Sequence, residues 1–265
     1  MTEIKLSKEV MDALNNNRPV VALESTIISH GLPRPRNLDA AKEFEEILRS
    51  QGVTPATIAI LDGTPNIKRV AMSPNGAGVR VFATGGLGGV HRGASSTFDE
   101  SADLSTLAVT PITVVAAGVK SVLDIPATLE RLETLSVPVV GWQTKNFPAF
   151  WLTQSGYTLD WKVDSAEEIA QLMKAQDELG HGQGIVVANP LPESKQWDPA
   201  EHDRVLEIAF KAADKAGITG KAVTPFLLGF IVEESKGKSL EVNLDLARNN
   251  VALAGKIAKA WSAIQ

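Results

Sequence analysis

The feature that most constrains the fold is an alternation along the chain between short apolar runs and longer segments with helical spacing. The short runs are rich in β-branched residues and apolar on both faces. They are too short for helices and are typical of strands buried within an α/β sheet. The expected strands are Val20–Leu23, Thr57–Leu61, Val79–Ala83, Ile112–Ala116, Val137–Gly141 and Ile185–Ala188.

The segments between these runs have the spacing of amphipathic helices. Apolar residues recur three or four positions apart, and the ends carry typical signals, such as Ser165 with Glu168 at a start and Gly217 at a stop. Strands that alternate with helices predict a three-layer α/β/α domain, here with a large mixed central sheet. No repeat or low-complexity linker interrupts residues 1–265, so we predict a single domain. The expected helices are Asn37–Ser50, Ser165–Gly180, Val205–Ala216 and Leu244–Ile264.

Composition excludes several classes of function. The 265 residues are 44% hydrophobic and 22% charged, which are ordinary proportions for a globular protein. A net charge of -5 argues against a nucleic-acid backbone as ligand. The absence of cysteine excludes disulfides, thiolate nucleophiles and cysteine-bound zinc. No apolar window is long enough for a membrane span, and Met1–Val10 lacks the core of a signal peptide, so we expect a cytoplasmic protein.

Polar residues follow several of the expected strands. Ligands of open α/β sheets bind beyond the carboxyl ends of the strands, so these residues are expected to converge on one edge. They are Glu24, Thr84–Gly86, Lys120, Gln143, Thr144 and Asn189.

Two polar stretches near this edge each allow a functional and a structural interpretation. Thr84–Gly93 reads TGGLGGVHRG, and its glycines let backbone N–H groups approach an anion, with Arg92 as a further donor. It is equally consistent with a flexible turn. Asp99, Glu100 and Asp103 place three carboxylates within five residues, a pattern that suits Mg²⁺ or Mn²⁺. The alternative is a solvated acidic start of a helix.

Lys120 and Glu24 are the strongest candidates for catalysis. Lys120 has apolar neighbours, and desolvation of a lysine frees its amine to attack carbonyl-like carbons. A surface lysine whose stem covers apolar groups is the alternative. Glu24 follows four apolar residues and is suited to general acid–base catalysis, or else to an ion pair or a helix cap.

A series of motifs resembles the pseudouridine-5'-phosphate glycosidases. The motifs occur in the family's order over nearly the whole chain, which is far more specific than any one of them. They are VALESTIISHGLP at 21–33, PATIAI at 55–60, FATGGLGGVHRG at 82–93, TFDxSADL at 97–104, AGVKSVLD at 117–124, LETLSVPVVG at 132–141, ANPLPE at 188–193, TPFLL at 224–228 and SLxxN at 239–243.

The resemblance implies an α/β/α homotrimer that reversibly cleaves the carbon–carbon glycosidic bond of pseudouridine 5'-phosphate to uracil and ribose 5-phosphate. By motif, Lys120 is the nucleophile that holds an opened-ring covalent adduct, and Glu24 is the proton donor and acceptor. Asp99 is the Mn²⁺ ligand, largely through waters. The residues implied to contact substrate are Ser101, Ala102, Asp103 and Asn243, the last of which faces the base. The implied partners are these small molecules alone, without nucleic acid or membrane.

This assignment agrees with the chemistry of the bond. A carbon–carbon glycosidic bond has no basic leaving atom, so protonation of a leaving oxygen cannot break it. An imine at Lys120 supplies an electron sink, and Glu24 can move the protons.

The chain departs from the family between Pro65 and Val79, where it is shorter by a few dozen residues. The missing part normally carries a substrate-binding lysine, and Lys68 or Arg69 is a weak candidate to replace it. A phosphate site that loses one charged donor is weakened. Two other interpretations therefore remain: a catalytically weakened homologue that acts as a binding or assembly subunit, and a Schiff-base aldolase that would use Lys120 but not Asn243.

Overall fold

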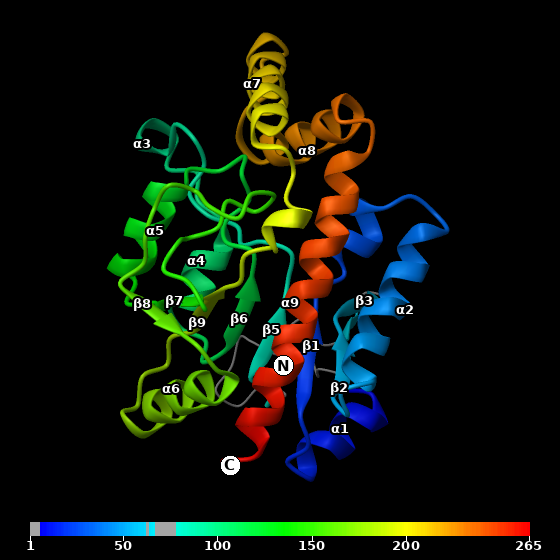
Figure 1. Cartoon of the computed structure of the whole chain (residues 1–265), viewed down its shortest axis with the longest axis vertical. Helices are drawn as coiled ribbons and strands as arrows, with labels where there is room; N and C mark the ends of the chain where they lie inside the picture. Colours follow the sequence, from blue (N-terminus) through cyan, green and yellow to red (C-terminus); the bar gives the residue numbers. More distant parts are fainter. Residues whose placement is uncertain (1–5, 62–63, 67–77) are drawn as a thin grey trace.

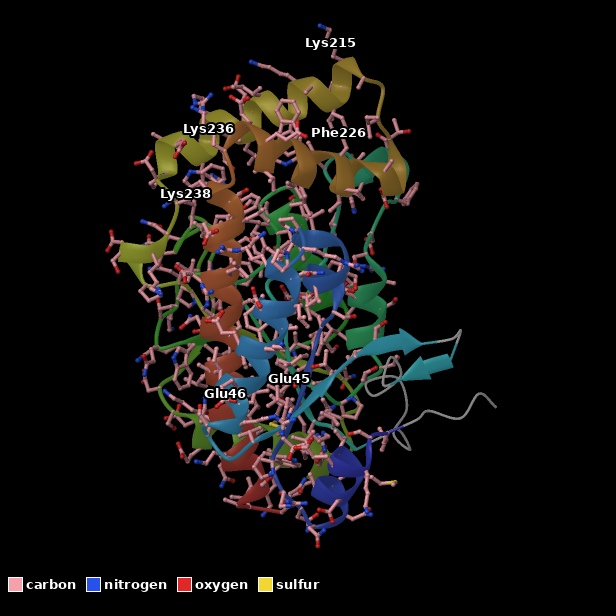
Figure 2. The ribbon with its side chains drawn as sticks, turned by 90° about the vertical axis from the view of Figure 1, so that its right-hand side faces the viewer. Glu45, Glu46, Lys215, Phe226, Lys236 and Lys238 are labelled. Atoms are coloured by element: carbon pink, nitrogen blue, oxygen red, sulfur yellow. The ribbon has the colours of Figure 1, made fainter. Side chains whose placement is uncertain are left out.

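A computed structural model describes residues 6–61, 64–66 and 78–265. Its centre is a seven-stranded sheet in the order β2-β1-β5-β6-β9-β7-β8 (Figure 1). A separate hairpin of β3 (Ala59–Leu61) and β4 (Thr64–Asn66) projects from the side of the molecule (Figure 2). The strands of the main sheet are β1 (Val20–Leu23), β2 (Thr54–Thr57), β5 (Val81–Ala83), β6 (Thr113–Ala116), β7 (Val139–Trp142), β8 (Trp161–Val163) and β9 (Ile185–Ala188).

The three-layer α/β/α architecture is confirmed, but the expectation of a mixed sheet is wrong. Every pairing within the seven-stranded sheet is parallel. Parallel strands cannot be joined by tight hairpins, so long crossover connections, most of which carry helices, link the strands of this sheet. The only antiparallel strand pair in the described ranges is the hairpin outside the sheet.

Strands in the centre of the sheet bury side chains on both faces, as continuous apolar runs predict. In β6, Val114 and Ala116 face one helical layer, whereas Val115 faces the other. One core includes side chains of α4 (Ala102–Leu107), α5 (Ile125–Thr134), α7 (Pro199–Lys215) and α8 (Val223–Glu234). The opposite core includes those of α2 (Arg36–Arg49), α6 (Ala166–Glu178) and α9 (Lys238–Ser262). A smaller cluster joins α1 (Lys8–Asn15) to β1 and β2.

Several element boundaries differ from those expected. The run Thr57–Leu61 is not one strand: β2 ends at Thr57, and Ala59 begins the separate hairpin. β2 contains Pro55, which the edge position tolerates because one side of an edge strand needs no N–H donor. The helices α7 and α9 both begin six residues before the expected starts. Helix α8 was not predicted, because its apolar residues surround the axis and leave no stripe to detect.

The helix ends follow local chemistry. Ser165 accepts a hydrogen bond from the Glu168 N–H at the start of α6, which confirms the predicted cap. Asp198 caps α7 with Pro199 in the first turn. In Figure 1, α7 and α8 lie beyond the end of the sheet to which β6 points, so they stand above the carboxyl ends of the strands. None of the helices in the described ranges is long and apolar enough to cross a membrane.

Candidate active site

One loop connects almost all of the predicted site residues. It is the stretch Thr84–Gly93, called here the glycine loop, and it leaves the carboxyl end of β5. Along its length it contacts Glu24, then the backbone of Lys120, then Ser101 and Asp103, and finally Asp99. The sequence prediction of convergence on the carboxyl edge of the sheet is therefore confirmed for Glu24, Thr84–Gly86 and the backbone of Lys120.

Glu24 is held at the beginning of the glycine loop. It directly follows β1 and is half-buried. Its Oε1 accepts a hydrogen bond from Thr84 Oγ1 at 2.5 Å and another from the Gly85 N–H at 3.0 Å. These three residues, together with Ala247 and Val251 of α9, line a small pocket. Two donors on one carboxylate oxygen leave the second oxygen, Oε2, able to exchange a proton with a ligand.

Lys120 lies next along the loop. The loop and the segment after β6 pair in parallel at Leu87 and Val119. The Leu87 N–H donates to the Gly118 carbonyl at 2.9 Å, and the Lys120 N–H donates to the Leu87 carbonyl at 3.2 Å. Gly85, which contacts Glu24, and Leu87, which contacts the Lys120 backbone, are two residues apart. Two residues of extended chain span only about 7 Å, so the two contacts lie close together along the loop.

The Lys120 side chain is half-buried, between the fully buried Val119 and the buried Ser121. Within the part of the chain that the structure describes, no carboxylate lies within ion-pair distance of its ammonium group. Salt bridges near the site instead join other residues, such as Glu100 with Arg131 at 2.9 Å. A lysine that makes no ion pair keeps its side-chain nitrogen available for contact with a substrate.

Ser101, Ala102 and Asp103 form the start of α4 against the middle of the loop. Ser101 caps the helix by accepting from the Asp103 N–H at 3.2 Å, and its own N–H donates to the Gly89 carbonyl. Asp103 Oδ2 accepts from the Gly88 N–H at 2.8 Å. A Cβ at Gly88 would lie 2.2 Å from Ser101 Oγ, so the close approach of loop and helix requires glycine there.

Asp99 lies at the exposed end of the loop. Its carbonyl accepts from the His91 N–H, and its Oδ2 is 3.8 Å from His91 Nδ1. The Asp99 side chain is 30% exposed, and the neighbouring Phe98 is 85% exposed with a backbone φ of 56°. Among the described residues no group of three or more His, Cys, Asp or Glu side chains converges as a metal cage. The Asp99 carboxylate is accessible, as are the more exposed Glu100 and Asp103 nearby.

Helix α9 presents one stripe of side chains to the site. Asn243, Leu246 and Asn250 are spaced by three and four residues and so share a face. Asn243 Oδ1 accepts from the Trp151 indole N–H at 2.7 Å. Leu246 packs beside Gly85, where its Cδ1 is 3.2 Å from the position a Cβ would take. Asn250 donates to the carbonyls of Thr84 and Gly85.

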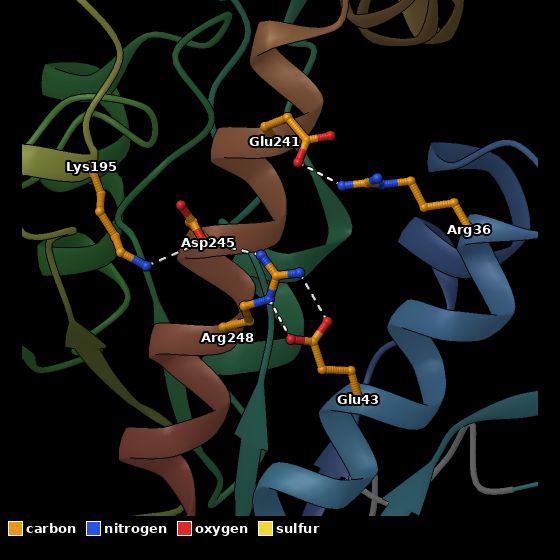
Figure 3. A network of polar contacts seen from close by, with 6 residues as sticks. All are labelled: Arg36, Glu43, Lys195, Glu241, Asp245 and Arg248. Atoms are coloured by element: carbon orange, nitrogen blue, oxygen red, sulfur yellow. Dashed lines mark hydrogen bonds and ion pairs between the residues drawn. The ribbon is translucent and has the colours of Figure 1, made fainter.

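The solvent side of α9 is tied to its neighbours by ion pairs. Arg248 makes two hydrogen bonds to Glu43 of α2, at 2.7 and 2.9 Å, and a third to Asp245 (Figure 3). Asp245 also pairs with Lys195, and Arg36 pairs with Glu241 at 2.5 Å. These exposed contacts connect three segments around the stripe, which helps to fix the rotation of the helix.

Other predicted residues have structural rather than site contacts. Arg92 stacks over the Phe210 ring of α7 at 4.2 Å, and burial lowers the pKa of its guanidinium. Gln143 donates to the Asp164 carbonyl, and Thr144 accepts from the Asn146 N–H. Lys68 and Arg69 lie outside the described residues.

Sequence reasoning missed Trp151 and Asn250. Trp151 lies in a loop without a recognisable motif, and its role depends on contact with a helix 92 residues away. Asn250 could have been identified from the sequence, because a buried amide within an apolar helix needs a hydrogen-bond partner. Asn189, which was predicted, reaches the site only through Asn250, to which it donates at 2.9 Å.

Comparison with known proteins places the chain in a family. The sequence profile described as "Indigoidine synthase A like protein" matches residues 9–73 and 69–260. A pseudouridine-5'-phosphate glycosidase from Frankia alni is 53% identical over 99% of this chain and 83% of that protein. Its counterpart from Saccharopolyspora erythraea is 48% identical over 97% of each chain.

Solved structures agree over the full length. The prealnumycin C-glycosynthase AlnA, in complex with ribulose 5-phosphate, superimposes with a TM-score of 0.88 and 29% identity, over 100% of this chain and 99% of that one. An indigoidine synthase A-like protein from Thermotoga maritima has a TM-score of 0.85 and 31% identity, over 98% and 96% of the two chains.

The comparisons also locate the shortened segment. The alignment with the Frankia alni protein spans 300 positions, more than the 265 residues of this chain, and the profile match is interrupted near residues 69–73. This interruption falls between Pro65 and Val79, where the motifs indicated missing residues. With motifs, architecture and relatives in agreement, the chain belongs to the family of indigoidine synthase A-like proteins and pseudouridine-5'-phosphate glycosidases.

Proposed function

We propose that the protein reversibly cleaves the carbon–carbon glycosidic bond of pseudouridine 5'-phosphate to give uracil and ribose 5-phosphate. The observation that carries this proposal is that the Glu24 carboxylate and the Lys120 backbone both bind one short stretch, Gly85–Leu87, of the glycine loop. A nucleophile and a proton carrier that act on the same sugar must lie within a few ångströms of each other. The names of the curated relatives supply the substrate.

In the proposed reaction the free amine of Lys120 adds to the anomeric carbon as the bond to the ring oxygen breaks. The ring oxygen takes a proton and becomes a hydroxyl group. The nitrogen lone pair then forms an imine while the bond to the base breaks, and the base carbon keeps that electron pair and gains a proton. Water hydrolyses the imine and releases ribose 5-phosphate. Glu24, held by Thr84 and Gly85, donates and accepts these protons.

The other predicted site residues take positioning roles. We place Ser101, Ala102 and Asp103 against the substrate, because the start of α4 is exposed beside the loop and a helix start favours an anion. Asn243 would face the base, with its amide oriented by Trp151: Oδ1 accepts the indole proton, so Nδ2 stays available to donate.

Asp99 would hold Mn²⁺, mainly through water molecules. The partly exposed carboxylate of Asp99 fits an ion that keeps most of its water ligands. The ion would supply positive charge for the phosphate end of the substrate. This positive charge matters more in a chain that is shortened between Pro65 and Val79.

We also propose that the protein is a homotrimer, with α8 in the contact between copies. Helix α8 reads VTPFLLGFIVEE, is apolar around its whole circumference, and buries only Leu227 and Ile231 within one chain. Phe226 and Phe230 stack on each other and remain partly exposed. A helix that is apolar on all sides is normally enclosed by protein. Light scattering of the wild type and of Phe226→Lys tests this, and the substitution should yield monomers.

The decisive experiment incubates the protein with pseudouridine 5'-phosphate and Mn²⁺ and follows uracil release, with and without borohydride. We expect turnover and a reduced sugar-phosphate adduct on Lys120 by mass spectrometry. Lys120→Ala should abolish both, whereas Lys145→Ala, which removes an exposed lysine after β7, should change neither. Uracil release without an adduct would exclude the covalent mechanism. If neither uracil nor the adduct forms, the glycosidase is excluded and a binding or assembly subunit remains.

A further inference from the structure

Two buried asparagines lie directly behind the pocket of Glu24. Asn250 of α9 is fully buried, and Asn189, which follows β9, is 3% exposed. Asn189 Nδ2 donates to Asn250 Oδ1 at 2.9 Å. Asn250 Nδ2 in turn donates to the Thr84 carbonyl at 2.7 Å and to the Gly85 carbonyl at 3.2 Å. Both partners of Nδ2 can only accept, so the orientation of this amide is unambiguous.

The contact with Thr84 matters because of what lies at the other end of the same peptide unit. The Thr84 carbonyl and the Gly85 N–H belong to one rigid plane. The carbonyl of this plane accepts from Asn250, and its N–H donates to Glu24 at 3.0 Å. A rotation of the plane that released Asn250 would also turn the N–H away from the carboxylate.

Asn250 is well placed to prevent that rotation. The Gly85 carbonyl has a second donor, the Ala117 N–H, and the Thr84 N–H donates to Val115. The Thr84 carbonyl has only Asn250 as a donor among the described residues. Gly85 has no Cβ to restrict its φ, so the plane before it turns more easily than a plane between two residues that carry a Cβ.

We infer that Asn250 is a positioning residue for Glu24, because it locks the Thr84–Gly85 peptide plane that presents an N–H to the Glu24 carboxylate. The inference rests on the proposed function for its catalytic consequence, but the geometric part stands by itself. Asn250 does not line the pocket of Glu24. It acts through the backbone of the glycine loop, and Asn189 fixes the rotation of its side chain.

The neighbouring Asn249 offers a matched control. It lies on the same helix, is partly buried, and also donates from its amide to a backbone carbonyl, that of Pro190 at 3.1 Å. It does not contact the glycine loop. If both asparagines have only a structural role, Asn249→Leu and Asn250→Leu should have similar effects. If Asn250 positions Glu24, only Asn250→Leu should disturb Glu24.

The experiment measures steady-state kinetics of uracil release from pseudouridine 5'-phosphate, together with amide hydrogen exchange of Gly85 by NMR. For Asn250→Leu we expect kcat to fall about 10- to 100-fold with KM changed less than about threefold, because the misplaced group is the proton carrier. Gly85 exchange should accelerate about tenfold or more as its hydrogen bond is lost. Asn249→Leu should leave kcat within about threefold and Gly85 exchange unchanged.

Unchanged kcat and unchanged Gly85 exchange in Asn250→Leu would overturn the inference, as would equal losses in both variants. If Asn250→Leu does not fold, Asn250→Asp replaces it, since it keeps the shape and the acceptor for Asn189 but offers its carboxylate no N–H for Thr84. If the wild type releases no uracil, the proposed function fails, and Gly85 exchange still decides whether Asn250 holds the peptide plane.

Discussion

The two ends of the glycine loop differ sharply in how firmly they are held. At the inner end, Thr84–Gly86 lies under α9, accepts hydrogen bonds from the buried Asn250, and packs against the buried Phe150. At the outer end, His91–Gly93 faces the accessible Asp99 and the almost fully exposed Phe98. Both ends belong to one segment of ten residues, five of which are glycine.

This contrast teaches how one loop can serve two tasks. A proton carrier needs fixed hydrogen bonds and little water, because small displacements slow proton transfer. A cation bound through water needs space for its hydration shell. In the proposed function, the inner end would meet the first requirement and the outer end the second.

The largest expected difference concerns activity. Glu24→Gln should lower kcat about 1000-fold, within the range for loss of a general acid–base group, and added Mn²⁺ should not restore it. Asp99→Asn should cost less, and raised Mn²⁺ should recover part of the loss, since water ligands hold most of the ion. Titration of initial rates against Mn²⁺ for both variants checks this. Equal losses of kcat in the two variants, both unaffected by Mn²⁺, would contradict separate roles for the two ends of the loop.

A second difference should appear in stability. At Gly86 an added Cβ would lie 2.5 Å from Phe150 Cδ2, and Phe150 is itself held at a φ of 60°. Gly86→Ala should therefore lower the free energy of unfolding by about 2–3 kcal/mol. At Gly93 no atom lies within 4 Å of an added Cβ, and only its φ of 80° opposes alanine. Gly93→Ala should cost about 1 kcal/mol. Urea unfolding of both variants measures the difference, and similar costs would show that the inner end is not packed tightly.

A third prediction concerns the indole that holds Asn243. Trp151→Phe removes the N–H that donates to Asn243 Oδ1 and should raise KM several-fold, with about 1 kcal/mol lost from the free energy of unfolding. Trp197→Phe is the control, because that indole packs edge-on against Trp151 but donates to Glu201 instead. It should cost similar stability without a change in KM. An equal rise in KM would mean that general packing, rather than the hydrogen bond, positions Asn243.

The smallest effect is a dependence of stability on pH. His202 packs against Trp151, and burial lowers its pKa from the ordinary 6.5, an effect that Asp203 only partly offsets. The unfolded chain therefore takes up this proton at a higher pH than the folded chain does. The free energy of unfolding should fall as pH drops below 6.5, and His202→Gln should reduce that slope. Urea unfolding at pH 7.5 and 5.5 tests this, and an unaltered slope in the variant would refute it.

Local patterns predicted much of the fold because the physics involved is local. The apolar runs at Val20–Leu23 and Ile185–Ala188 became strands with the expected ends, since residues apolar on both faces can only be buried in the middle of a layered domain. Ser165 capped its helix because the cap is completed by a residue only three positions away. The break between Thr57 and Ala59 was not predictable, because leaving the sheet depends on neighbours distant in sequence.

For the candidate site, the sequence alone determined which chemical groups are available and that they stand at the carboxyl ends of strands. The motifs named Glu24, Lys120 and the Ser101–Asp103 stretch without any coordinates. Only the tertiary structure decided how these groups are held. Gly85 and Leu87 bring Glu24 and the backbone of Lys120 to one stretch of the loop, and Asn250 binds Gly85 from a helix 165 residues away. The reason is that hydrogen-bond geometry between remote segments depends on how the helices pack on the sheet, which no short stretch of sequence encodes.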